Sequence, residues 1–168
     1  TRALIEERNI SAALIHLKKS KNASAFHYFI GYHDKVVSVE QCYDVVRDVP
    51  VNSTTIHTNH FVDPHLSRYG AAYPHSLARY DKLGSNLANS EGNFIKSRSD
   101  NIGSGGKNRR KDVLGCLFDR SQPDPLYCMG EHDSRTLSTV LFYPLQNKVE
   151  IYPQNSRRSR QQFKLKGI

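Results

Sequence analysis

The strongest constraint on the fold is a pair of strand-forming runs joined by a two-residue polar turn. Residues 25–32 read AFHYFIGY, residues 35–41 read KVVSVEQ, and His33-Asp34 lie between them. β-Branched and aromatic side chains pack well on a pleated sheet, and a short polar link of this kind joins antiparallel neighbours. The pattern predicts a β-hairpin, followed by a further short strand at residues 43–46 before Pro50.

Apolar residues at helical spacing predict three helices elsewhere in the chain. The first two cover residues 3–7 and 10–19, and Asn9 stands between them as the expected N-cap of the second. The longest is expected at residues 76–89, with Ser76 as its cap.

The last third of the chain is rich in strand-forming residues. Strands are expected at residues 126–129, 136–144, 148–153 and 162–165, with a turn over residues 144–147. Residues 54–61, TTIHTNHF, predict one more strand earlier in the chain. Because residues 136–144 carry apolar side chains on both faces, we expect that strand to be covered on both sides, as in a layered α/β arrangement.

Length and composition favour one domain that buries a real core. The chain has 168 residues, of which 38% are apolar, with 10 glycines and 7 prolines. No window approaches the roughly 18 consecutive apolar residues of a membrane span. Three Asn-x-Ser/Thr triplets, at Asn9, Asn22 and Asn52, leave the compartment unknown.

The net charge of +8 raises nucleic acid as a partner, but the distribution of charge disfavours it. The basic residues gather in the glycine-rich residues 97–112 and near the end of the chain, and neither cluster is a helix face interleaved with aromatics. The glycine-rich run lacks phosphate-binding spacing and predicts a surface insertion. The thiols of Cys42, Cys116 and Cys128 show no paired spacing, so reduced structural cysteines are expected.

Two short motifs point to a family. Residues 56–61 read IHTNHF, and residues 76–79 read SLAR. This combination resembles the penicillin acyltransferase-like cysteine hydrolases of the N-terminal-nucleophile superfamily, in which a strand ending in a TNH-type tripeptide precedes a helix that opens with Ser-x-x-Arg. The order of helices, hairpin and closing strand pair is similar over nearly all of the chain. The resemblance implies the α+β class and a partial four-layer αββα fold, with residues 1–168 as its C-terminal portion.

The resemblance also implies a chemistry, hydrolysis or acyl transfer at linear amide C–N bonds. In the family the nucleophile is an N-terminal Cys whose own α-amino group is the base. The resemblance assigns Asn59 to the oxyanion hole and Arg79 to the role of site arginine. It implies a small-molecule acyl amide or acyl-coenzyme A as substrate, an upstream segment of the same protein as partner, and no cofactor.

The departure from the family lies at the start of the chain. No cysteine is N-terminal, and Thr1 leads into a helical pattern, whereas the family's nucleophile begins a central strand. We therefore do not expect Thr1 to be catalytic. The chain opens without Met inside an apolar pattern, so we expect the nucleophile segment upstream and the fragment alone to be inactive.

Both site assignments have structural alternatives. Asn59 could cap the turn into Asp63-Pro64, and Arg79 could form a surface ion pair with Asp81 or Glu91.

Histidines surround Asn59 in the sequence and suggest a metal at first sight. His57 and His60 are separated by three positions, so on a strand they point to opposite faces, and no carboxylate follows at ligand spacing. We therefore expect no metal site formed by His57, His60 and the nearby His65. We expect His57 or His60 either to orient Asn59 from behind or to fill half-buried strand positions.

Two further functions stay open from the sequence. One is a non-catalytic binding or structural relative of the same fold, which predicts no processable Cys upstream. The other is a basic nucleic-acid-binding module, which predicts binding that weakens steeply with salt.

Overall fold

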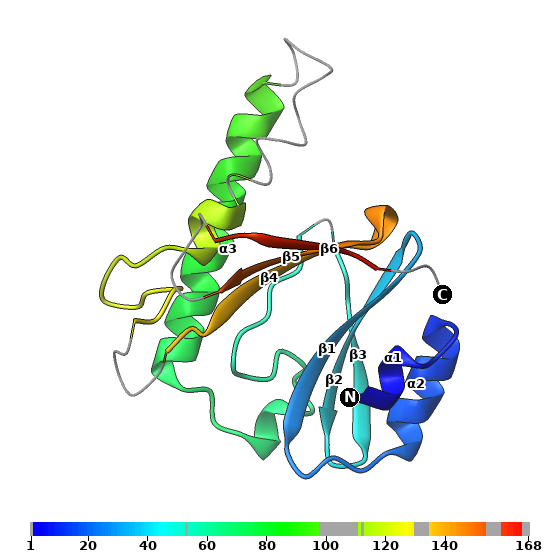
Figure 1. Ribbon diagram of the computed structural model, residues 1–168. Helices are drawn as coiled ribbons and strands as arrows, with labels where there is room; N and C mark the ends of the chain where they lie inside the picture. The colour runs from blue at the N-terminus through cyan, green and yellow to red at the C-terminus, as the bar shows by residue number, and fades with distance from the viewer. Residues whose placement is uncertain are drawn as a thin grey trace.

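A computed structural model describes residues 2–52, 54–97, 111, 113–129, 135–153 and 159–165. It is a mixed α/β structure with two antiparallel sheets, each of three strands, in the orders β1-β2-β3 and β4-β5-β6 (Figure 1). The elements in chain order are α1 (Arg2–Ile5), α2 (Ile10–Lys19), β1 (Ala25–Tyr32), β2 (Lys35–Cys42), β3 (Val45–Val49), η1 (Ser67–Tyr69), α3 (Pro74–Ser97), β4 (Ser138–Tyr143), η3 (Pro144–Gln146), β5 (Lys148–Pro153) and β6 (Gln161–Lys164). Residues 113–117 are also helical.

The predicted hairpin is confirmed as β1 and β2. Their register pairs Tyr32 with Lys35 across the turn and His27 with Glu40 further along. His33 in the turn has φ of 54°, in the left-handed region that tight hairpin turns require. The short third strand is confirmed as β3, slightly later than predicted.

Helix α2 covers one face of this first sheet. Its buried residues Ala13 and Leu17 lie on the side where Val39 and Gln41 are fully buried. The Gln41 Nε2 group donates to the carbonyl oxygens of Leu17 and Ser20, at 3.1 Å each. Gln41 therefore ties the C-terminal end of α2 to β2, where the Leu17 carbonyl also accepts from the Ser20 N–H.

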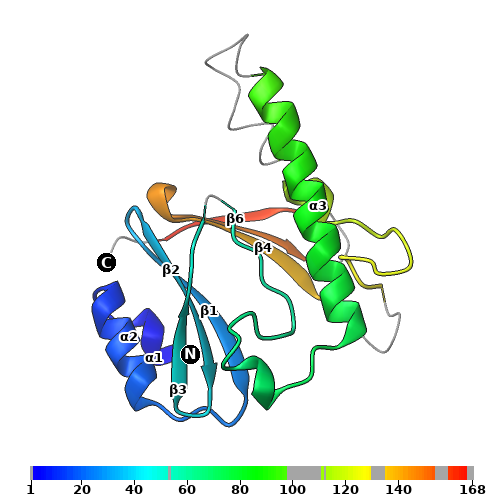
Figure 2. The ribbon, with the colours of Figure 1, turned by 180° about the vertical axis from the view of Figure 1, so that it is seen from behind.

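The opposite face of the first sheet carries a loop. Successive side chains on a strand point to opposite faces, so Glu40 faces away from α2. The segment between β3 and α3 lies against that face and connects it to α3, as both views show (Figures 1 and 2). The loop and α2 thus sit on opposite sides of β2.

The second sheet has a separate core. Leu114, Phe118, Tyr127 and Tyr152 form a buried cluster in which Phe118 stacks on Tyr127 at 5.2 Å between ring centroids. The helix at residues 113–117 thereby covers one face of β4 and β5. The 144–147 turn is confirmed as η3 followed by Asn147, whose φ is 46°.

Three predictions about elements were wrong. Residues 54–61 form no strand, because their polar side chains bond to β2 and α3 instead of entering a ladder. Residues 126–129 form no strand beyond a single bridge from Met129 to Arg135. The helix predicted at residues 76–89 is confirmed as part of α3, but Ser76 is not its cap, because α3 begins at Pro74 and runs past residue 89.

The expectation that β4 is covered on both sides is also wrong within the described residues. Thr139 is buried, whereas Phe142 on the alternate face is 68% exposed and Val140 is 38% exposed. Among the described residues, therefore, one apolar face of β4 is left uncovered. The glycine-rich insertion predicted at residues 97–112 falls almost entirely outside the described residues.

Asn9 was correctly predicted as the N-cap of α2, and its removal is a test of that helix. Its side-chain oxygen accepts from the Ala12 N–H at 2.9 Å. We expect Asn9→Ala to lower the free energy of unfolding by about 1 kcal/mol, because one orphan N–H loses its partner. Urea unfolding followed by circular dichroism measures the change. Asn9→Asp keeps an acceptor and should cost far less, and equal losses in both variants would contradict the cap.

Candidate functional site

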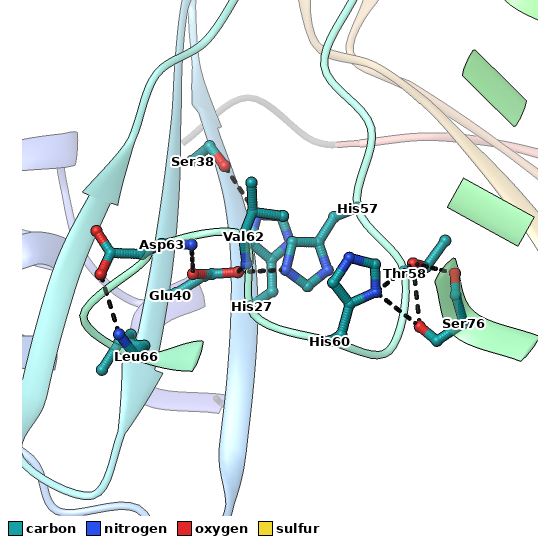
Figure 3. Close-up of polar contacts among 10 residues, drawn as sticks. All are labelled: His27, Ser38, Glu40, His57, Thr58, His60, Val62, Asp63, Leu66 and Ser76. Atoms are coloured by element: carbon teal, nitrogen blue, oxygen red, sulfur yellow. Dashed lines mark hydrogen bonds and ion pairs between the residues drawn. The ribbon is translucent and has the colours of Figure 1, made fainter. Parts of the chain in front are cut away.

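A buried carboxylate on β2 holds both ends of the loop that contains Asn59. Glu40 is fully buried and accepts from His57 Nε2 at 2.7 Å, from the Val62 N–H at 2.6 Å and from the Asp63 N–H at 2.8 Å (Figure 3). One donor precedes Asn59 in the sequence and two follow it. Because a carboxylate only accepts, the His57 proton in this bond lies on Nε2.

His27, on the neighbouring strand β1, packs against the His57 ring that donates to Glu40. Its ring stacks on His57 with centroids 3.7 Å apart and planes at 6°, and its Nε2 lies 2.8 Å from Ser38 Oγ. The pKa of His27 is lowered from 6.5 to about 4, chiefly by burial and then by the neighbouring His57, while Glu40 acts to raise it. The His27 ring is therefore neutral near pH 7.

The tip of the loop is bonded to the first turn of α3. Thr58 Oγ1 donates to the Ser76 carbonyl at 3.0 Å, and His60 Nδ1 lies 2.9 Å from Ser76 Oγ (Figure 3). Ser76 is 1% exposed, and the His60 ring meets the Tyr80 ring edge-on at 5.4 Å. The loop thus joins the first sheet to α3.

Asn59 and Arg79, the two residues assigned from the resemblance, are in direct contact. An Arg79 guanidinium nitrogen donates to Asn59 Oδ1 at 3.1 Å, and Arg79 Nε donates to the His75 carbonyl at 3.1 Å. A guanidinium has no acceptor, so the amide oxygen must face it and Nδ2 must point elsewhere. Asn59 is exposed, and no group among the described residues accepts from its Nδ2. An N–H donor held in this way is suited to an anionic oxygen.

His57 and His60 flank Asn59 but do not bond to its side chain. His57 bonds to the sheet and His60 to α3, so they face opposite sides of the loop. Within the described part of the chain, no three His, Cys, Asp or Glu side chains gather as a metal site would require. The role of either histidine in orienting Asn59 stays a prediction.

Sequence reasoning missed the residues that fix the loop. Glu40, His27 and Thr58 were not assigned roles, and Ser76 was expected only as a helix cap. The available signal was Glu40 itself, a charged residue directly after Val39 in an otherwise strand-forming run. A carboxylate in such a position is buried only when it finds donors.

These features define the class of the protein as a mixed α/β fold that exposes an oriented amide donor on a loop. The family model described as acyl-coenzyme A:6-aminopenicillanic acid acyl-transferase matches residues 1–158, so the chain belongs to that family. The predicted resemblance is confirmed, and membership implies acyltransferase activity in general, on small-molecule acyl substrates. Comparisons with curated proteins and with solved structures gave no match. Within the described residues, no helix has the length and apolar character that spanning a membrane demands.

The lowered pKa of His27 predicts acid sensitivity of the folded protein. Above pH 6.5 the ring is neutral in both states, so its contribution to stability is fully present. As the pH falls from 6.5 to about 4, only the unfolded state takes up the proton, and the free energy of unfolding decreases; below about 4 the loss is complete. We expect His27→Phe, which keeps an aromatic ring against His57, to make the free energy of unfolding less dependent on pH in this range.

Urea unfolding at a series of pH values measures the effect as the slope of the free energy of unfolding against pH. His65→Phe, at an exposed histidine of the same loop region, is the matched control and should keep the wild-type slope. Equal slopes for His27→Phe and the wild type between pH 6.5 and 4 would contradict the assignment.

Proposed function

We propose that this chain supplies the oxyanion donor and substrate-pocket residues of an enzyme that transfers acyl groups or hydrolyses linear amide C–N bonds. The observation that carries the proposal is the hydrogen bond from Arg79 to Asn59 Oδ1. It fixes the amide so that Nδ2 is the end available to a ligand. Acyl transfer needs such a donor where the carbonyl oxygen gains negative charge.

In this proposal the nucleophile is an N-terminal Cys that lies outside these 168 residues. The three cysteines present are internal, and Cys116 is buried within the second core. An N-terminal Cys brings its own base, because an unperturbed α-amino group titrates near pH 8. The thiol would attack the acyl carbonyl, the α-amine would take the thiol proton and return it to the leaving amine, and Asn59 would donate to the tetrahedral oxyanion.

We also propose the partial four-layer αββα architecture and the C-terminal position of residues 1–168 within it. The support is the apolar surface that is exposed on the face of each sheet opposite its helix. Phe29 and Val36, on the face of the first sheet opposite α2, are 49% and 44% exposed, and Phe142 in the second sheet is 68% exposed. Sheet faces of this kind are normally packed against a further layer.

The proposed substrates are small molecules that contain an acyl amide or an acyl-coenzyme A thioester. The family name supplies two practical probes, an acyl-coenzyme A as donor and 6-aminopenicillanic acid as acceptor. A p-nitroanilide of the same acyl group tests hydrolysis, because its amine product is coloured. The transfer assay and the p-nitroanilide assay together separate transfer from hydrolysis without assuming either.

Replacing Asn59 tests the oxyanion assignment. In the protein that includes the Cys-bearing upstream segment, we expect Asn59→Ala to lower kcat by about 100- to 1000-fold, the usual cost of one oxyanion donor. The change should leave KM much less affected, since the interaction forms mainly in the transition state. Steady-state rates with the probes above give both constants.

Asn52→Ala is the matched control, because Asn52 is an exposed asparagine in the same inter-element segment and is bonded to Thr55 through its backbone. It should retain the wild-type kcat. If Asn59→Ala also retains it while the complete protein is active, the oxyanion assignment is wrong.

A further inference from the structure

We propose that Glu40 is the positioning residue of this site: its buried carboxylate fixes the loop that presents Asn59 and so sets where the amide donor meets the developing oxyanion. The inference rests on the proposed function. It concerns a residue that touches no substrate and acts only through the loop.

The loop has no regular structure of its own to hold its shape. Residues 55–62 belong to no helix or strand, so their backbone groups need partners from elsewhere. Glu40 supplies these partners at the far end, where its two oxygens accept separately from Val62 N–H and Asp63 N–H. At the near end it accepts from His57. Asn59 lies between the two attachments.

The far end of the loop is locked again immediately afterwards. The Asp63 carboxylate accepts from the backbone N–H groups of His65 and Leu66, at 2.8 and 3.1 Å, and Leu66 is fully buried. Movement at Val62 would therefore disturb a packed turn. This coupling makes the Glu40 attachment stiff rather than adjustable.

Attachments on the α3 side cannot replace Glu40. Thr58 and His60 bond to Ser76, and Asn59 bonds to Arg79, so all of these contacts place Asn59 relative to α3. The hydrogen bonds that place it relative to the first sheet are those to Glu40, beside which the His27 ring of β1 stacks on His57. A misplacement of about 1 Å in a reacting geometry can cost on the order of 100-fold in rate.

The surroundings of Glu40 argue against a direct chemical role. The side chain is fully buried, and both oxygens are occupied by donors from the protein. His27 stands opposite Glu40 in the β1–β2 register and stacks on His57, on the same face of the sheet. A general base must reach the substrate or a water within hydrogen-bonding distance, and Glu40 is enclosed.

The test is a double-mutant cycle in the protein with its upstream segment. Glu40→Gln keeps the size of the side chain but replaces one acceptor oxygen with a donor, so at least one loop contact is lost. We expect kcat with the acyl p-nitroanilide to fall by about 10- to 100-fold, less than the loss of the donor itself, with KM within about 3-fold. In the Asn59→Ala background the same change should lower kcat by no more than about 3-fold, because the residue it positions is absent.

Glu150→Gln is the control, since Glu150 is an equally buried carboxylate that accepts from Tyr143 and Tyr152 in the other sheet. Its small effect on kcat should be the same with and without Asn59. Equal fold-losses for Glu40→Gln in the two backgrounds would overturn the positioning role. A rate that is insensitive to Asn59→Ala alone would instead overturn the proposed function.

His57→Phe keeps the cycle decisive if Glu40→Gln does not fold. The phenyl ring preserves the stack on His27 but cannot donate to Glu40, while the two backbone donors remain. We expect a smaller loss, about 3- to 10-fold, that again disappears in the Asn59→Ala background. A loss that persists there would contradict the inference.

Discussion

The burial of the Glu40 carboxylate is the constraint on which the first half of the structure depends. A carboxylate removed from water is costly unless it is hydrogen-bonded, and each bond to a charged group contributes roughly 1.5–3 kcal/mol. Glu40 recovers that cost from three donors, two of them backbone amides of a segment without regular structure. The strand and the loop therefore stabilise each other.

Adjacent residues of β2 each bond to another segment of the chain, on opposite faces of the sheet. Gln41 donates to the end of α2, and Glu40 accepts from the loop. The second sheet also buries a carboxylate, Glu150, which accepts from Tyr143 and Tyr152 of the same sheet. Glu150 therefore joins neighbouring strands, whereas Glu40 joins a strand to a distant segment. Because the segment that Glu40 holds contains Asn59, the candidate site lies beside the first sheet.

The sequence pattern predicted the helices and strands that depend on residues adjacent in the sequence. The β1–β2 hairpin follows from strand-forming runs around His33-Asp34, and the start of α2 follows from Asn9. Residues 54–61 have the same strand-forming composition, yet tertiary bonds to Glu40 and Ser76 override it. The partners of Glu40 lie 17 to 23 positions away, a separation at which no periodicity carries information. Asn59 and Arg79 were found by resemblance, and their mutual contact emerged only in three dimensions.

The geometry of Asn59 bears on whether the chain is catalytic or only structural. An asparagine that merely caps a turn uses its side-chain oxygen to accept from nearby backbone N–H groups. Here that oxygen accepts instead from a cationic side chain on another element. Such a bond is charge-assisted, and it polarises the amide so that its N–H groups become better donors. Arg79 would then contribute orientation and donor strength together, and both serve a developing oxyanion. A purely structural Asn59 would need neither, so the contact favours the catalytic reading over a non-catalytic relative.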